Sequence, residues 1–154
     1  MITFEDVLET MGRVYYDRST NEHIVLLSDN DNKKALHNIE KGLEISGKLY
    51  NRKCKVKAIN TESPLEYSKQ FKNETVRFLF LDYPKSLEFF NDVLKSWGER
   101  ICFFGAIMFR GNYEDEELEK HPIDERYVGA LHGIYRTDPP LTIIYKKWGM
   151  PYVK

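Results

Sequence analysis

A regular alternation of strand-like and helix-like segments between Ile24 and Phe109 constrains the fold most strongly. Apolar residues gather in short runs typical of buried strands, and between these runs they recur at helical spacing. The clearest run, VRFLFL at residues 76–81, is apolar almost throughout, which predicts a strand buried on both faces. Strands that alternate with helices form right-handed crossovers and a parallel sheet. The order predicts an α/β fold, a Rossmann-like three-layer domain with a mostly parallel sheet.

The individual segments can be assigned from apolar periodicity and from turn residues. A short helix at 4–11 and a strand-like stretch at 14–16 come first. Further strands are expected at 24–28, 54–59, 76–81 and 101–109, with helices at 32–46, 64–71 and 84–97 between them. Near the end of the chain, runs at 127–135 and 141–145 flank a short turn, which predicts an antiparallel strand pair. Because no linker or repeat interrupts the chain, residues 1–154 are expected to form a single α/β domain.

Charge and composition exclude some classes of function. A net charge of −1, from 23 basic and 24 acidic residues, gives no signal for nucleic acid as the main partner. The two cysteines, Cys54 and Cys102, lie in apolar runs without metal-ligand spacing, so we expect buried thiols in a reducing compartment. The longest apolar run, at residues 101–109, is far shorter than the roughly 20 residues that span a bilayer.

These features predict a cytoplasmic protein without a membrane segment. The start of the chain, MITFEDVLET, also lacks the cationic and apolar regions of a signal peptide. The ten Tyr and nine Phe residues require either a large core or an apolar interface, because each ring buries a large area. The aromatic content therefore leaves a homo-oligomer open.

Polar residues follow each predicted strand, at the edge of the sheet where such folds bind ligands. The first strand is followed by Asp29 and Asp31, and the second by Asn60 and Thr61. A carboxylate in such a position can accept hydrogen bonds from both hydroxyls of a ribose. Alternatively, either aspartate can cap the helix that follows. Asp29-Asn30-Asp31 also matches the DxD pattern of nucleotide-sugar glycosyltransferases, in which paired carboxylates hold a metal.

The third strand is followed by Asp82, Tyr83 and Lys85. Because this strand is the most apolar, Asp82 is expected near the middle of the sheet, where a carboxylate can bind a metal, orient a substrate or act as a base. Lys85 can approach the same crevice, where partial burial favours the neutral, basic amine. The alternative is that Asp82 caps the next helix and that Lys85 is solvated.

The segment from Asp29 to Gly111 resembles the class I S-adenosylmethionine-dependent methyltransferases, and most closely the catechol and caffeoyl-CoA O-methyltransferase branch. SDNDNKKALHNIEKGLEISG resembles the acidic strand end and following helix of that family. FLFLDYPKSLEFFNDVLKSWGERICFFGAIMFRGN resembles its next strand, helix and strand, including an FLD-x-x-K pattern. The resemblance covers a little over half of the chain.

The resemblance implies transfer of a methyl group from S-adenosylmethionine to a hydroxyl of a small molecule. It implies that Asp31, or else Asp29, holds the ribose of the cosubstrate, and that Asn60 and Thr61 lie near the adenine. Asp82 would be the carboxylate on the metal side, and Lys85 the base that removes the hydroxyl proton. The candidate cofactor-binding residues are Asp29, Asp31, Asn60, Thr61 and Tyr83, and the candidate catalytic residues are Asp82 and Lys85.

The chain departs from this family in two places. The glycine-rich turn after the first strand is missing, since only Gly12 precedes Asp31. The second metal position should fall at residues 105–108, where Gly-Ala-Ile-Met offers no side-chain oxygen, so no metal is expected. These departures leave a second hypothesis open, a pseudoenzyme that binds or inhibits a protein partner on a nucleotide-binding scaffold.

Overall fold

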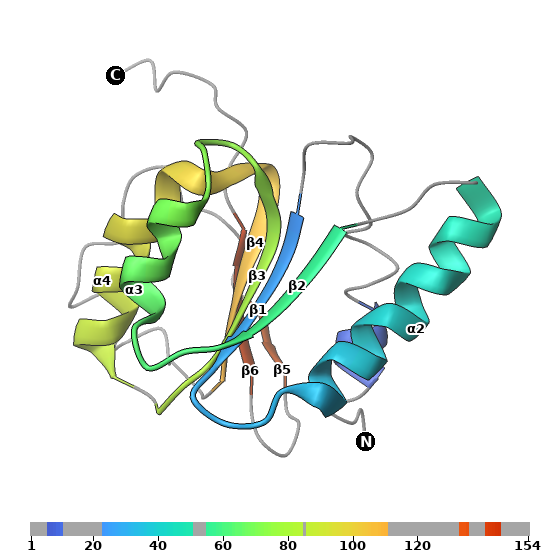
Figure 1. Ribbon diagram of the computed structural model, residues 1–154, viewed down its shortest axis with the longest axis horizontal. Coiled ribbons are helices and arrows are strands. Elements are labelled where there is room, and N and C mark those ends of the chain that lie inside the picture. The colour runs from blue at the N-terminus through green and yellow to red at the C-terminus, as the bar shows by residue number, and fades with distance from the viewer. Residues whose placement is uncertain are drawn as a thin grey trace.

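The strands assemble into one mixed sheet. The computed structural model describes residues 6–10, 23–50, 55–84, 86–110, 133–135 and 141–145. Its six-stranded sheet has the order β2-β1-β3-β4-β6-β5 (Figure 1). The strands are β1 (His23–Ser28), β2 (Lys55–Asn60), β3 (Val76–Asp82), β4 (Ile101–Arg110), β5 (Gly133–Tyr135) and β6 (Leu141–Tyr145).

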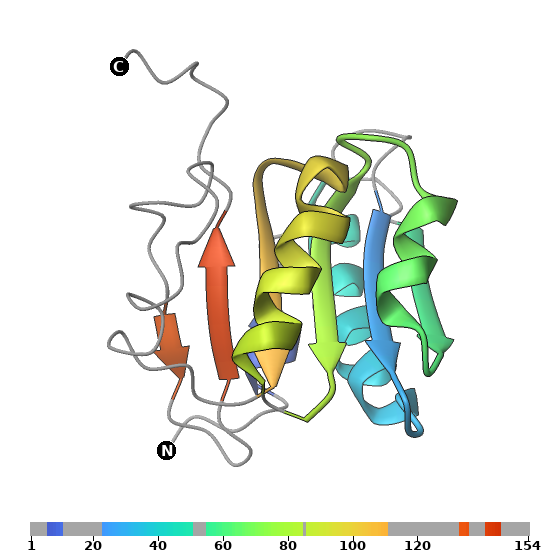
Figure 2. The same cartoon turned by 90° about the vertical axis from the view of Figure 1, so that its left-hand side faces the viewer.

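Strands β1 to β4 are parallel, and the C-terminal strands form the predicted antiparallel pair. Strand β6 runs antiparallel to both β4 and β5, as its reversed arrow shows in Figure 2. The sequence-based prediction of a mostly parallel α/β sheet with an antiparallel pair at its end is therefore confirmed.

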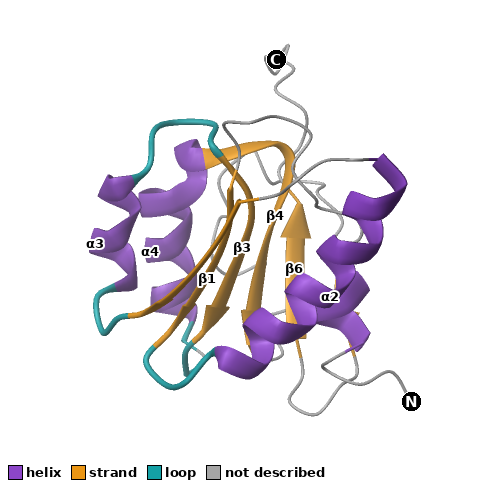
Figure 3. Cartoon of the chain, turned by 45° about the vertical axis from the view of Figure 1, so that its right-hand side comes forward, coloured by secondary structure: helices purple, strands orange, loops and turns teal. Residues whose placement is uncertain are grey.

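Helices cover both faces of the sheet. α3 (Pro64–Tyr67), with the 3-10 turn η1 (Ser68–Gln70), lies beside α4 (Leu87–Trp97), which continues into the turn η2 (Gly98–Arg100). The other face carries α2 (Lys33–Tyr50) (Figure 3). A helical segment at residues 6–10 packs on the same side as α2. None of the helices in the described ranges combines the length and apolarity that a bilayer crossing requires.

Alternate side chains of the central strands pack into two separate hydrophobic cores, one on each face of the sheet. In β1, Val25 and Leu27 pack with α3 and α4, whereas Ile24 and Leu26 pack with α2. All four are 0% exposed. Burial on both faces explains why these strands are apolar throughout, and it leaves polar side chains to the strand ends.

Several helix boundaries differ from the prediction. The helix predicted at 64–71 is an α-helix at Pro64–Tyr67 and continues as the 3-10 turn Ser68–Gln70. The helix predicted at 32–46 continues to Tyr50, because an isolated glycine such as Gly47 costs only about 1 kcal/mol relative to alanine and does not break a helix. The helix predicted from Pro84 begins at Leu87 instead, because Ser86 caps it: the Ser86 Oγ accepts the Phe89 N–H at 3.2 Å. The segments predicted at 14–16 and 127–132 lie outside the described residues.

Gly105 provides a test of packing between β3 and β4. A Cβ at this position would lie 2.7 Å from Ile101 Cγ2, 2.8 Å from the Cys102 carbonyl oxygen and 2.9 Å from the Arg77 carbonyl oxygen. Two of these neighbours are backbone atoms, which cannot move without disturbing the strand pair. We predict that Gly105→Ala lowers the free energy of unfolding by about 1–3 kcal/mol, measured by urea titration. The exposed substitution Lys95→Ala is the control, and an unchanged midpoint for Gly105→Ala would contradict this packing.

Candidate functional site

The order of strands reverses once between β1 and β3, and this reversal locates the candidate site. The chain places β2 on one side of β1 and then β3 on the other. Ser28 at the end of β1 is in register with Asn60 of β2 and with Asp82 of β3. Ligands of open parallel sheets bind outside the carboxyl ends of the strands at such a reversal. We call this edge the rim: residues 28–32, 60–63 and 82–84 together with Arg110, at the lower edge of Figure 2.

The central position of β1 corrects the interpretation of the acidic turn after it. The resemblance implies that the turn at residues 28–32 holds the ribose, through Asp31 or Asp29, and that the glycine-rich turn lies earlier in the chain. Both sides of β1 are occupied, by β2 and β3, so β1 itself borders the reversal. In Rossmann-like folds the glycine-rich turn belongs at this point, where backbone must approach the ligand closely. Here Ser-Asp-Asn-Asp-Asn takes its place.

The two aspartates of this turn have different surroundings. The Asp31 Oδ1 accepts the Lys33 N–H at 2.9 Å, so Asp31 caps the start of α2, as the capping alternative expected. Asp29 is exposed, and its Oδ1 accepts a hydrogen bond from the side chain of Asn30 at 3.1 Å. Asn32 donates to the carbonyl oxygens of Leu26 and Ile59, both at 3.3 Å, which ties β1 to β2. Asp29 is therefore the carboxylate of this turn that faces solvent without a capping role.

Tyr83 crosses the rim from β3 towards β2. Its hydroxyl donates to the Thr61 carbonyl oxygen at 2.7 Å, which connects the segment after β3 with the turn after β2 on the face that carries α3 and α4. The side chain is only 9% exposed, and its ring centroid lies 5.5 Å from that of Phe89. Burial raises the pKa of the Tyr83 hydroxyl above its ordinary value, and the carboxylates of Asp29 and Asp82 raise it further. Both aspartates therefore act on one hydroxyl at the same rim.

Asp82 is paired with an arginine that the sequence analysis did not single out. The Arg110 Nη1 donates to the Asp82 Oδ1 at 2.8 Å, joining the ends of β3 and β4. Asp82 does not cap α4, because Ser86 fills that role. Within the described ranges, no group of three or more His, Cys, Asp or Glu side chains is placed to hold a metal.

The remaining candidate residues fall on the β2 side of the rim or outside the described residues. Thr61 has its polar groups engaged in the turn: its N–H donates to the Ser28 carbonyl oxygen at 2.9 Å, and its Oγ1 accepts the Ser63 N–H at 2.9 Å. Asn60 is exposed at the end of β2. Lys85 lies outside the described residues.

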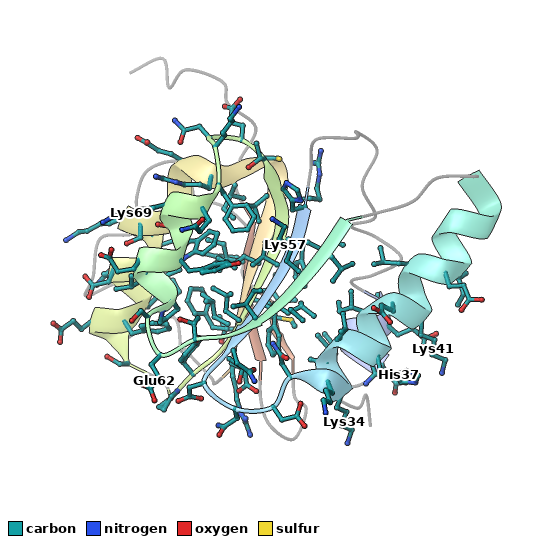
Figure 4. The ribbon with its side chains drawn as sticks, in the orientation of Figure 1. Lys34, His37, Lys41, Lys57, Glu62 and Lys69 are labelled. Atoms are coloured by element: carbon teal, nitrogen blue, oxygen red, sulfur yellow. The ribbon has the colours of Figure 1, made fainter. Side chains whose placement is uncertain are left out.

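The sequence analysis assigned no role to Glu62, which is exposed in the turn after β2 and is labelled at the lower left of Figure 4. In dinucleotide-binding sheets an acidic residue further along the chain than the glycine-rich turn binds the ribose. With β1 central and β2 beside it, Glu62 is the acidic side chain that follows the next strand. The signal was present in the sequence, but the spatial order of the strands was needed to interpret it.

The parallel sheet with its inserted antiparallel strand resembles the folds of solved methyltransferase structures. No protein family and no curated protein matches the sequence significantly.

Solved structures do match the fold. A Corynebacterium glutamicum protein has a TM-score of 0.62 at 11% identity, over 96% of this chain and 82% of the other. A methyltransferase from Geobacter sulfurreducens has a TM-score of 0.55 at 11% identity, over 92% and 77%. An N-methyltransferase from Haemonchus contortus, in complex with S-adenosylhomocysteine, has a TM-score of 0.51 at 10% identity, over 97% and 39%. At these identities the likeness establishes the fold, and the chemistry has to be argued from the residues of the rim.

The raised pKa of Tyr83 gives a pH-dependent prediction. A tyrosine in the unfolded chain ionises near pH 10, whereas the folded protein holds the Tyr83 proton to higher pH. The unfolded state then binds fewer protons, so stability is lost as the pH rises above about 10. We predict that the free energy of unfolding falls less between about pH 9 and pH 11 in Tyr83→Phe than in the wild type, measured by urea titration at each pH. If the free energy of unfolding changed with pH in the same way in both proteins, the pKa of the Tyr83 hydroxyl would not be raised by folding.

Proposed function

We propose that the protein binds S-adenosylmethionine at the rim and transfers its methyl group to a hydroxyl of a small molecule. One observation carries the proposal: Asp29 and Asp82 stand at the ends of neighbouring parallel strands, at the reversal of strand order in a sheet that resembles those of methyltransferases. The bound S-adenosylhomocysteine in the Haemonchus contortus enzyme supports this choice of cosubstrate.

The rim has two halves: residues 28–32 and 60–63 form the β1–β2 half, and residues 82–84 with Arg110 form the β3–β4 half. The β1–β2 half fits the nucleoside part of the cosubstrate. Glu62 and Asp29 are exposed carboxylates after neighbouring strands, and a carboxylate can bind both ribose hydroxyls at once. Asp31 is less suited to the ribose, because it already caps α2. We assign Asn60, which is exposed at the end of β2, to the adenine. Tyr83 has to leave the Thr61 carbonyl oxygen before a ligand can enter beside β1.

The β3–β4 half of the rim is assigned to the acceptor. S-adenosylmethionine supplies an electrophilic methyl group, and the protein's task is to align the acceptor hydroxyl with it. We assign Asp82, held by Arg110, to positioning the acceptor, and Lys85 to taking the hydroxyl proton as the general base.

Thermal melting with S-adenosylmethionine tests the proposal. A ligand at a hundred times its dissociation constant should add about 2.7 kcal/mol of stability. Glu62→Gln should weaken binding about tenfold, because it removes the charge that accepts the ribose hydroxyls. The matched control is Glu66→Gln, an exposed glutamate of α3 paired with Lys69. The absence of any melting shift at millimolar ligand would exclude the proposal.

Turnover separates binding from chemistry. We predict that Lys85→Ala keeps the melting shift with S-adenosylmethionine but lowers the methyl transfer rate by about 10²–10⁴-fold, as expected for loss of a general base. The measurement is release of S-adenosylhomocysteine in the presence of hydroxyl-bearing acceptors. Unchanged turnover in Lys85→Ala would remove the assigned role of this residue.

A second function is a non-catalytic binding protein, and the hydrogen bond from Tyr83 to Thr61 favours it. This bond ties the segment after β3 to the turn after β2, on either side of β1, and the turn after β1 has no glycine. Tyr83→Ala decides between the two functions in the same melting assay. If the ring only gates the cosubstrate, Tyr83→Ala should bind S-adenosylmethionine more tightly than the wild type. If neither protein responds, the non-catalytic function is supported.

A further inference from the structure

Arg110 differs from an ordinary surface arginine because it pairs with a carboxylate that is mostly buried. Its guanidinium is 2.8 Å from Asp82, yet the Asp82 side chain is only 19% exposed whereas that of Arg110 is 45% exposed. The ion pair between Lys69 and Glu66 has the same length, but its side chains are 69% and 71% exposed. Exposed pairs of the second kind contribute little to the stability of the fold. Arg110 is instead fixed to a mostly buried anchor while much of its side chain meets solvent.

A guanidinium held in this way retains donors for a ligand. Arginine carries five N–H donors in one plane, and the single contact with Asp82 through Nη1 leaves others unused by that contact. A planar fork of donors matches a carboxylate or a phosphate, which it binds through two parallel hydrogen bonds. Because Asp82 already restricts the side chain, less entropy is lost when such a ligand binds.

The position of Arg110 assigns this ligand to one half of the rim. Arg110 ends β4, next to the end of β3 and on the far side of β3 from β1. Asp29 follows β1 and Glu62 follows β2. Their negative charges disfavour an anion in the part of the rim formed by the ends of these two strands. A ligand with one anionic end is therefore oriented with that end towards β4, by attraction at one side and repulsion at the other.

We propose that Arg110 binds an anionic group, a carboxylate or a phosphate, of the molecule that occupies the β3–β4 half of the rim. Identification of this molecule as the methyl acceptor rests on the proposed function, whereas binding of the anion does not. The substrate class that follows is a hydroxyl-bearing small molecule with a carboxylate or phosphate at its other end.

Fragment binding followed by ¹H–¹⁵N NMR tests this inference. The probes are benzoate, phenyl phosphate and benzyl alcohol, which share a ring and differ in charge. We expect benzoate or phenyl phosphate to shift the amide signals of Arg110, Asp82 and Tyr83, and benzyl alcohol to leave them unchanged. The stronger of the two anions identifies the group. No shift with either anion at about 50 mM, a concentration above the millimolar range of weak fragments, would overturn the inference.

Two arginine variants and a matched control make the test specific. Arg110→Gln should weaken anion binding about tenfold or more, and Arg110→Lys should restore part of it, because lysine keeps the charge without the fork. Lys69→Gln breaks an ion pair of the same length away from the rim and should have no effect. Undiminished binding in Arg110→Gln would overturn the inference. Because no probe contains S-adenosylmethionine, failure here is distinguishable from failure of the melting assay.

Discussion

The parallel pairing of β1 with β3 is the constraint on which the rest of the molecule depends. Both strands are buried on two faces, so their interiors accept only apolar side chains, and polar groups are confined to their ends. The pairing puts Ser28 opposite Asp82, and the chain leaves the two strands in different directions from that point. A polar edge at the reversal of strand order follows directly. The candidate chemistry is therefore a consequence of how the core is buried.

Tyr83 connects the two halves of this edge, and the strength of its contacts decides whether the site can work. A hydrogen bond such as that to Thr61 contributes about 1 kcal/mol net, and burial of the ring adds to it. An opening penalty of one or two kcal/mol lowers the apparent affinity of a ligand by a factor of about 5–30. Such a penalty weakens a cosubstrate without excluding it. The hydrogen-bonded Tyr83 is thus compatible with methyl transfer as well as with loss of catalysis.

The order of elements along the chain was predictable, but their order in space was not. Apolar periodicity identified the strands and the C-terminal pair, because a buried strand needs apolar side chains at neighbouring positions of the sequence. Nothing local records which strand is central, since that is decided by the direction of each crossover. The resemblance therefore assigns the ribose to the acidic turn after β1 and gives no role to Glu62, which follows β2. Arg110 was missed for a related reason: its partner Asp82 lies 28 residues earlier in the chain.

Arg110 also changes the electrostatic role of Asp82. The family resemblance placed a second metal position at residues 105–108, but these residues lie inside β4 and their side chains are buried, so they cannot line the rim. The end of β4 that does reach the rim carries Arg110 instead. A guanidinium stays charged at every physiological pH, so it provides a fixed positive charge beside Asp82. A divalent cation at Asp82 would lie beside this guanidinium and be repelled by it. The edge is therefore better suited to an acceptor recognised through its own negative charge than to one recognised through a shared metal.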